Sequence, residues 1–360
     1  MSLIKVKSRG TDNVSSRRNL LVNGAMNVSQ RGTSFASPAH AAITLDQFRN
    51  GKSHDGAITI TQDSSGPSGF ANSLKVDVTT ADTSIAASQY QHIWHRIEAQ
   101  NLQQLAFGTS DAQNVTLSFY VKSNKTGTYA VVLGQNDNSF KQATLTYTIN
   151  SADTWERKSL TFNGDTSGVI NDDNGVGLEI NFILAIGSNY TSGSGGASFA
   201  TYADANYAAG HAVNLLDNTS NEWFLTGVQL EVGDSASDFE HRSFAEDLEL
   251  CKRYYQLIVE GNQKIISIAH WAASTEVDFV IHIPSMRTRP TLEYTTGNEY
   301  WRIGGSGGST NTLDNLNVNT WSTESNINLW TTTGAGGTAG YASYAYSNNA
   351  SAKLGFTAEL

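Results

Sequence analysis

The sequence predicts an all-β protein with an N-terminal jelly-roll β-sandwich, a short linking α-helix and a small C-terminal β-sandwich. Short segments that alternate between apolar and polar residues recur roughly every ten residues, separated by turn residues. Gly, Ser, Thr and Asn are abundant, and charged residues make up 16% of the chain, below the roughly 25% usual for globular domains. With 360 residues, the chain is long enough for two hydrophobic cores.

The first domain is expected to begin at residue 19, where Asn19–Gly24 predicts a strand that ends in an Asn-Gly turn. Further strands are expected at 43–48, 56–62, 74–78, 88–98, 114–122, 127–134, 142–149, 156–162, 177–186 and 222–232. Segment 187–214 is rich in Gly, Ser, Ala and Tyr and predicts an extended surface loop. A loop of that length indicates a contact or binding role.

The strand that closes this domain alternates cleanly. One face is expected to hold Phe224, Thr226, Val228 and Leu230, and the other Leu225, Gly227, Gln229 and Glu231. A helix should follow at 243–256, because Ser243 stands three residues before Glu246, the spacing of a capping box. Its apolar stripe comprises Phe244, Leu248, Cys251 and Tyr255. Cys251, the only cysteine, is therefore expected in the core and rules out an internal disulfide.

The remaining residues predict a distal β-domain. Strands are expected at 264–271, 276–283, 291–294 and 352–359, with glycine-rich loops at 304–308 and 334–337. The predicted organisation is thus a basic arm at 1–18, a jelly roll at 19–242, a linking helix at 243–256 and a distal β-domain at 257–360.

The first 18 residues carry a net charge of +4, in a chain whose net charge is −10. Their cations are Lys5, Lys7, Arg9, Arg17 and Arg18. A basic arm on an acidic body predicts a docking peptide, and no nucleic-acid partner is expected because no aromatic residues interleave these cations. No run of about 18 apolar residues and no secretory signal is present, which predicts synthesis in a cytoplasm without membrane insertion.

No set of residues predicts catalysis or a cofactor. The histidines are scattered, and His92 and His95 should point to opposite faces of one strand. A carboxylate pair for glycoside hydrolysis among Glu98, Glu179 and Glu231 stays open, because sequence cannot place them face to face. The only calcium candidates are Asp172 and Asp173, which an ordinary turn would explain equally well.

The strand at 88–98 carries the strongest candidate for binding. Ile93 and Ile97 should face the core, which leaves four side chains on the outer face: Tyr90, His92, Trp94 and Arg96. Tyr120 takes the outward direction on its own strand. Aromatic, imidazole and guanidinium groups on an open sheet can stack on sugar rings, or they can form a subunit interface in an oligomer. Both interpretations stay open.

A series of sequence segments occurs in a characteristic order: Asn19–Gly24 with Gln30–Ser34, Thr116–Ser123, Ala152–Glu156, Asp173–Leu178, Thr226–Gly233 with Asp238–Phe244, and Cys251–Gln256. Together these segments resemble a family of phage tail-fibre and virion-surface proteins of marine and cyanobacterial viruses. This resemblance covers about 19–256, and beyond it only Ile281–Pro290 continues the pattern. The first domain also resembles the jelly roll of carbohydrate-binding modules. Those modules often carry a structural calcium fed by an acid after the Asn-Gly, where this chain has Ala25-Met26.

The resemblance implies a non-enzymatic virion structural protein, a tail fibre or a capsid or tail surface appendage that contributes to host attachment. Such a protein would assemble as a homo-oligomer, with a trimer expected, and would meet other virion proteins through its arm. One alternative is a glycan-binding module proper that uses the Tyr90, His92, Trp94 and Arg96 face. Another is a polysaccharide depolymerase.

Overall fold

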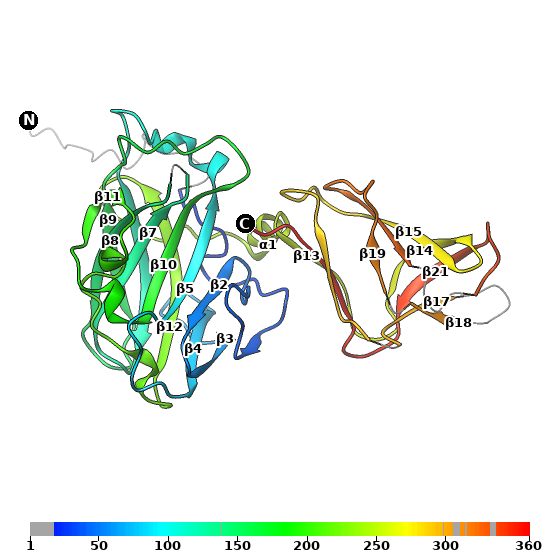
Figure 1. Cartoon of the computed structure of the whole chain (residues 1–360), viewed down its shortest axis with the longest axis horizontal. Coiled ribbons are helices and arrows are strands. Elements are labelled where there is room, and N and C mark those ends of the chain that lie inside the picture. Colours follow the sequence, from blue (N-terminus) through cyan, green and yellow to red (C-terminus); the bar gives the residue numbers. More distant parts are fainter. Residues whose placement is uncertain (1–17, 138, 298, 305–309, 314, 332–335) are drawn as a thin grey trace, which may run out of the picture. The chain divides into compact units, whose positions relative to one another are not determined.

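The computed structural model describes residues 18–137, 139–297, 299–304, 310–313, 315–331 and 336–360. The chain divides into two compact units, Met1–Asp247 and Leu248–Leu360 (Figure 1). Both units are built from antiparallel strands, so the prediction of an all-β fold is confirmed. The boundary between the units falls inside the segment predicted as the linking helix.

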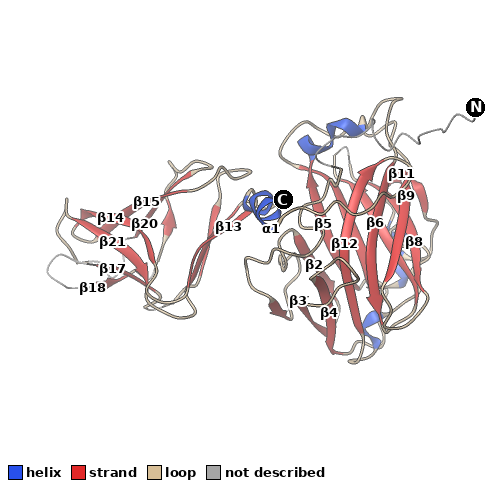
Figure 2. Ribbon diagram, turned by 180° about the vertical axis from the view of Figure 1, so that it is seen from behind, coloured by secondary structure: helices blue, strands red, loops and turns tan. Residues whose placement is uncertain are grey.

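The first unit is a β-sandwich of two six-stranded sheets (Figures 1 and 2). The first, here called the β12 sheet, consists in order of β1 (Ser34–Ala36), β3 (Ala57–Asp63), β4 (Ser73–Thr80), β12 (Glu222–Val232), β6 (Val115–Ser123) and β9 (Glu156–Phe162). The second, the β10 sheet, consists of β11 (Gly196–Thr201), β8 (Lys141–Ile149), β7 (Gly127–Gln135), β10 (Val176–Ile186), β5 (Tyr90–Glu98) and β2 (Phe48–Ser53). Four short 3₁₀ helices lie in the connections: η1 (Ala99–Leu105), η2 (Ser188–Tyr190), η3 (Asp204–Asn206) and η4 (Leu215–Asp217).

The core of this unit lies between the two sheets. Phe119 of the β12 sheet packs edge-on against Phe182 of the β10 sheet, with ring centroids 5.1 Å apart. Ile93 and Ile97 of β5 belong to the same core cluster, as their alternation predicts. Because the inward residues alternate along each strand, the residues between them form the outer faces of the sandwich.

The second unit is also a β-sandwich. Its three-stranded sheet consists of β13 (Tyr255–Glu260), β22 (Lys353–Thr357) and β16 (Thr291–Tyr294). Its seven-stranded sheet consists of β18 (Thr310–Thr312), β17 (Trp301–Gly304), β21 (Ala342–Ser347), β14 (Ile265–Ala273), β15 (Glu276–His282), β20 (Asn326–Thr331) and β19 (Asn317–Val318). The two sheets share one core, to which Phe356, Trp271 and Phe279 contribute. Sequence analysis did not predict β17–β21.

Two of the predicted strands are wrong. Residues 19–24 form bends and a turn, because Asn23 takes a left-handed φ of 60° and its side chain hydrogen-bonds the backbone at Val28. In the predicted strand 43–48, Gln47 likewise has φ 72°, so the chain turns there and β2 begins at Phe48. Segment 187–214 is not a plain loop either, since it contains η2, β11 and η3.

β12 alternates on both sides of Gly227, but the predicted shared face of Phe224, Thr226, Val228 and Leu230 is divided there. The core cluster takes Trp223 and Leu225 and then Val228 and Leu230, so the inward parity changes between them. A β-bulge causes the change, because the pairing of β12 with β6 skips between Thr226 and Gln229. Gly227 has φ 62° within this bulge, a conformation that favours glycine.

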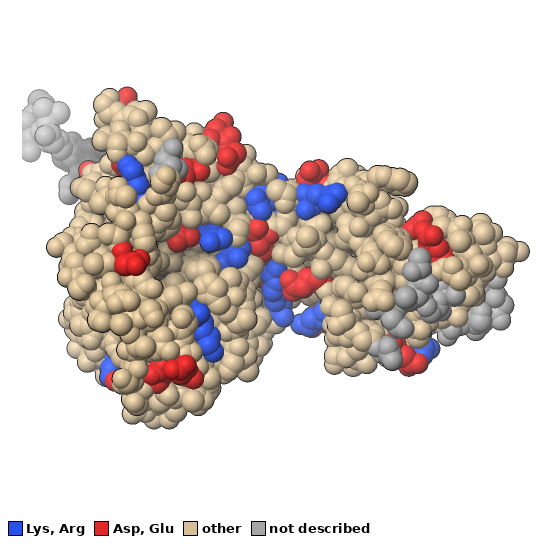
Figure 3. Space-filling model, in the orientation of Figure 1, with Lys and Arg blue, Asp and Glu red and all other residues tan. Residues whose placement is uncertain are grey.

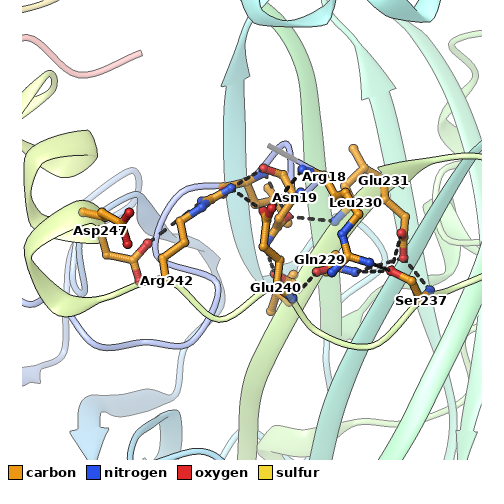
Figure 4. Close-up of polar contacts among 12 residues, drawn as sticks. Arg18, Asn19, Gln229, Leu230, Glu231, Ser237, Glu240, Arg242 and Asp247 are labelled. Atoms are coloured by element: carbon orange, nitrogen blue, oxygen red, sulfur yellow. Dashed lines mark hydrogen bonds and ion pairs between the residues drawn. The ribbon is translucent and has the colours of Figure 1, made fainter. Parts of the chain in front are cut away.

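A polar cluster ties the start of the first unit to β12, and Figure 4 shows its residues. The Glu240 carboxylate accepts the backbone N–H groups of Arg18 and Asn19, at 3.1 and 2.9 Å. The Arg242 guanidinium donates to the Asn19 carbonyl at 2.6 Å and to the Glu240 carboxylate at 2.9 Å. Gln229 of β12 accepts the Glu240 N–H at 2.8 Å. We call Asn19, Gln229, Glu240 and Arg242 the latch.

The helix α1 (Phe244–Lys252) is shorter than predicted, because the chain enters β13 at Tyr255. Its capping box is present: the Ser243 N–H donates to the Glu246 carboxylate at 2.8 Å, and the Glu246 N–H donates to Ser243 Oγ at 3.3 Å. Cys251 is buried as predicted, whereas Phe244 at the start of the stripe is 58% exposed. Among the residues described, no helix combines the length and apolarity needed to cross a membrane.

Candidate functional site

The four outward side chains of β5 lie on the outer face of the β10 sheet. Tyr90 and His92 stack with their ring planes 7° apart and centroids at 5.2 Å, and His92 and Trp94 follow at 5.0 Å. The Arg96 guanidinium lies 5.3 Å from the Trp94 ring. The structure therefore brings these residues together as one continuous row along the strand.

This face is not the open sheet that the sequence predicted. His92 and Trp94 are only 5% and 8% exposed. The segment after β10 folds back toward the row, so that Tyr190 contacts Tyr90 with ring centroids 6.3 Å apart. Tyr207 of the same segment joins a small apolar cluster with Ile183 of β10. Tyr90 and His92 thus form one wall of a partly covered cavity, whereas Trp94 packs against His40 with ring centroids 5.4 Å apart.

The cavity has a volume of about 330 Å³. Its lining residues are Tyr90, His92, Phe140, Ile186, Tyr190, Tyr202 and Tyr207. Neighbouring rings touch around it, with Phe140 5.6 Å from Tyr202 and Tyr202 5.9 Å from Tyr207. Sequence analysis pointed to the loop that supplies these tyrosines but could not say which surface it covers.

Two glycines, one on β2 and one on β7, leave space for aromatic side chains of the cavity wall. Gly51 of β2 pairs with His92, and a β-carbon on Gly51 would stand 1.9 Å from His92 Nε2. Gly134 of β7 pairs with Glu179, and a β-carbon there would stand 2.6 Å from the Phe140 ring. Glycine inside a strand marks a close approach of this kind, and that signal was available in the sequence.

An ion pair stands at the Arg96 end of the row. Arg96 Nε lies 3.4 Å from the Glu179 carboxylate, which also accepts hydrogen bonds from Asn136 and Asn181. Burial, followed by the charge of Glu179, raises the pKa of Tyr207 well above its usual value. Its hydroxyl is therefore protonated at neutral pH and can donate.

The imidazole of His92 is buried and uncharged. Burial lowers its pKa to about 3, helped by the nearby His40. The two ring nitrogens of His92 and the indole nitrogen of Trp94 have no hydrogen-bond partner among the described residues. A neutral imidazole offers one donor and one acceptor, and indole offers one donor. Buried polar atoms normally have hydrogen-bond partners, so these three nitrogens are unsatisfied within the described part of the chain.

The other predicted site residues lie elsewhere. Tyr120 is on the β12 sheet, where it packs against Phe70 with ring centroids 5.2 Å apart. Tyr120 therefore lies on a different sheet from the β5 row, since outward parity on a strand does not say which of two sheets the strand joins. Lys5, Lys7, Arg9 and Arg17 of the predicted arm lie outside the described residues. Arg18 is described and bonds to Glu240, Ser237 and Asp238 of the first unit.

The acidic candidates lie apart, except that Glu98 of β5 and Glu179 of β10 stand on neighbouring strands of the β10 sheet. Asp173 Oδ1 accepts the Gly175 N–H at 2.8 Å within a turn, and both Asp172 and Asp173 are exposed. Across the described ranges, no three His, Cys, Asp or Glu residues gather in a way that could hold a metal ion. Glu179 stands on the β10 sheet and Glu231 on the β12 sheet, where Glu231 accepts Ser237 at 2.6 and 2.8 Å.

No protein-family model matches the chain, and no curated protein matches its sequence. The solved structures that are similar to this chain include the following three, each of which matches about 60% of it. A putative sugar binding protein from Bacteroides thetaiotaomicron is 14% identical, with 60% of this chain and 100% of that chain covered and a TM-score of 0.33. A family 11 carbohydrate-binding module of a Clostridium thermocellum cellulase is 11% identical, with 58% and 98% covered and a TM-score of 0.30.

The third is the enzymatically active domain of tailspike protein 4 of bacteriophage CBA120, 11% identical, with 60% of this chain covered and a TM-score of 0.32. The match spans only 22% of that tailspike chain. At these identities and TM-scores, the function of the present chain has to be argued from its own residues.

Proposed function

We propose that the first unit binds carbohydrate in the aromatic cavity on the outer face of the β10 sheet, and that the protein is a non-enzymatic virion component that uses this site in host attachment. The observation that carries the binding proposal is the lining of the cavity, where the stacked rings of Tyr90 and His92 face further tyrosines and the buried His92 imidazole lacks hydrogen-bond partners. Sugar rings need both features, an apolar face to stack against and polar groups for their hydroxyls.

The low charge of the surface agrees with a neutral ligand. Large parts of the face in Figure 3 carry neither Lys or Arg nor Asp or Glu. Within the cavity lining, Tyr90, Tyr190 and Tyr202 offer hydroxyls and ring faces but no net charge at neutral pH. The ion pair of Arg96 with Glu179, at the end of the row, is internally neutralised.

A glycan array probed with the full-length chain tests the binding proposal. Wild-type protein should give signals that Tyr90→Ala removes, because this half-buried ring forms the accessible end of the row. Tyr341→Ala is the matched control, since Tyr341 is exposed in the second unit. Signals that survive in Tyr90→Ala, or no signals from the wild type, would count against a glycan site in this cavity.

The virion role is supported by the basic residues among the first 18 of the chain and by the segments that resemble phage fibre and surface proteins. We propose a closed homo-oligomer, with a trimer expected, docked on the particle through the arm. Mass spectrometry of purified particles of the encoding virus should detect the chain, and native mass spectrometry should give the mass of three copies. If the chain is absent from purified particles, the virion assignment is wrong.

A further inference from the structure

A second hollow lies on the same sheet face, toward the β8 and β11 edge. Its volume is about 200 Å³, and its lining residues are Gln142, Thr144, Ser194, Gly195, Gly196, Ala197, Ser198, Ala200 and Asn206. Segment 200–207 borders both hollows: Ala200 and Asn206 line this one, while Tyr202 and Tyr207 line the aromatic cavity. The two hollows therefore lie on either side of one short stretch of chain.

Gln142 provides the observation that points to a ligand. It is 3% exposed, and its Nε2 donates to the Ala203 carbonyl at 3.1 Å. That bond fixes the orientation of the amide, because only the nitrogen can donate to a carbonyl. The remaining atom, Oε1, is buried and has no hydrogen-bond partner among the described residues. A buried acceptor without a partner is unfavourable, so this position calls for an N–H or O–H donor.

The rest of the lining specifies the kind of donor. Thr144 Oγ1 donates to the Tyr207 carbonyl at 2.9 Å, which leaves its lone pairs to accept. Ser198 Oγ accepts from Asn163 at 2.7 Å, which leaves its own O–H to donate. No lining residue is charged and none is aromatic. The hollow is therefore suited to a neutral group with several hydroxyls that does not need a stacking surface.

We propose that this hollow is a second carbohydrate subsite, which takes a neutral, hydroxyl-rich sugar residue of the glycan held in the aromatic cavity. This inference rests on the proposed function of that cavity. One sugar residue stacks among the tyrosines, the glycan passes over segment 200–207, and a further residue donates a hydroxyl to Gln142 Oε1. A sugar acid is disfavoured here, because no cation lines the hollow to pair with its carboxylate.

Gly196 offers a way to block the hollow without disturbing the fold. It lines the hollow, and a β-carbon built on it meets nothing within 4 Å. Gly196→Leu should therefore fill the space and leave the melting temperature close to that of the wild type. The matched control is Gly336→Leu, because Gly336 is equally open and lies in the second unit. Gln142→Met is the second variant, since it keeps the length of the side chain and removes the acceptor.

Calorimetric titration of the full-length chain measures its affinity for cellohexaose, xylohexaose and laminarihexaose. It is repeated with any oligosaccharide that an array of bacterial glycans identifies. We expect Gly196→Leu and Gln142→Met each to weaken binding of the long oligosaccharide about tenfold, the effect of losing one or two hydrogen bonds and their buried surface. Binding of the corresponding disaccharide, which fills only the aromatic cavity, should be unchanged.

The outcomes separate the two proposals. Loss of binding in Tyr90→Ala together with wild-type affinity in both Gly196→Leu and Gln142→Met refutes the subsite and leaves the aromatic cavity intact. Equal weakening of long and short oligosaccharides also refutes it, because the hollow would then act only on the neighbouring cavity. If no oligosaccharide binds the wild type, both proposals are wrong.

Discussion

Gly51 and His92 are partners across β2 and β5, and the imidazole of His92 occupies the space that a side chain at position 51 would need. One ring nitrogen would lie 1.9 Å from a β-carbon on Gly51. The aromatic row of the cavity therefore depends on a residue with no side chain on the neighbouring strand.

Gly51→Ala should displace His92 and lower the free energy of unfolding of the first unit by about 1–3 kcal/mol, the usual effect of overpacking. Any glycan affinity of the cavity should fall with it. The double variant Gly51→Ala/His92→Ala removes the clash and should recover most of the lost stability but not the affinity. Calorimetric scans of the full-length variants measure this, and a Gly51→Ala protein as stable as the wild type would contradict the close contact.

The sequence contained the alternation of β5 but not its surroundings. Alternation depends only on the period of a strand, so the outward direction of Tyr90, His92, Trp94 and Arg96 could be predicted. The cover formed by Tyr190, Tyr202 and Tyr207 could not, because a long loop has no periodicity that states where it packs. Tyr120 shows the same limit, since assigning its strand to a sheet requires long-range pairing.

The bulge in β12 leads to a second prediction. Gly227 combines a φ of 62° with close neighbours: a β-carbon would stand 2.8 Å from the Phe70 ring and 2.9 Å from the Tyr120 ring. Gly227→Ala should lower the free energy of unfolding by about 2–4 kcal/mol, because backbone strain and overpacking act together. Gly340 has a φ of 86°, but a β-carbon built on it meets no atom within 4 Å. In Gly340→Ala, only the backbone strain therefore acts.

Gly340→Ala should therefore lose about 1 kcal/mol. Chemical denaturation of both variants gives the comparison. Equal losses would mean that the ring contacts at Gly227 relax freely. An isolated glycine inside a strand pattern usually signals a bulge, so the position of Gly227 in the sequence already indicated this one in part.

The latch predicts a dependence of stability on pH. Burial alone would raise the pKa of Glu240, but hydrogen bonds from the Asn19 and Arg18 backbone and the ion pair with Arg242 lower it below the usual value of 4.5. A carboxyl whose folded pKa is lowered contributes stability above its unfolded pKa and loses it as the pH falls through the folded pKa.

Glu240→Gln should therefore destabilise the first unit by about 1–2 kcal/mol at pH 7, since hydrogen bonds to a charged acceptor are lost at a partly exposed position. The difference from the wild type should shrink as the pH falls below 4.5. Glu249→Gln is the control, because Glu249 is 61% exposed and pairs only within the helix, so its loss should be near zero. A constant difference between pH 3 and pH 7 would show that the charge of Glu240 has no role.

Buried histidines should make the first unit sensitive to acid. Burial lowers the pKa of His92 to about 3, and the pKa values of His95 and His211 to about 4. Because the usual histidine value is 6.5, the unfolded chain binds protons between pH 6.5 and these lowered values while the folded chain does not. Stability is therefore fully present above pH 6.5 and is lost as the pH falls toward 3 to 4.

His92→Phe keeps an aromatic ring between Tyr90 and Trp94 and removes one of these titrating groups. Between pH 4 and pH 6 the slope of unfolding free energy against pH should decrease by about one proton, or about 1.4 kcal/mol per pH unit. Urea denaturation at several pH values measures the slope. Tyr90→Phe is the control, because it alters the same row and removes no histidine. An unchanged slope in His92→Phe would mean that the imidazole is already protonated in the folded protein, and the cavity would then hold a cation suited to an anionic ligand.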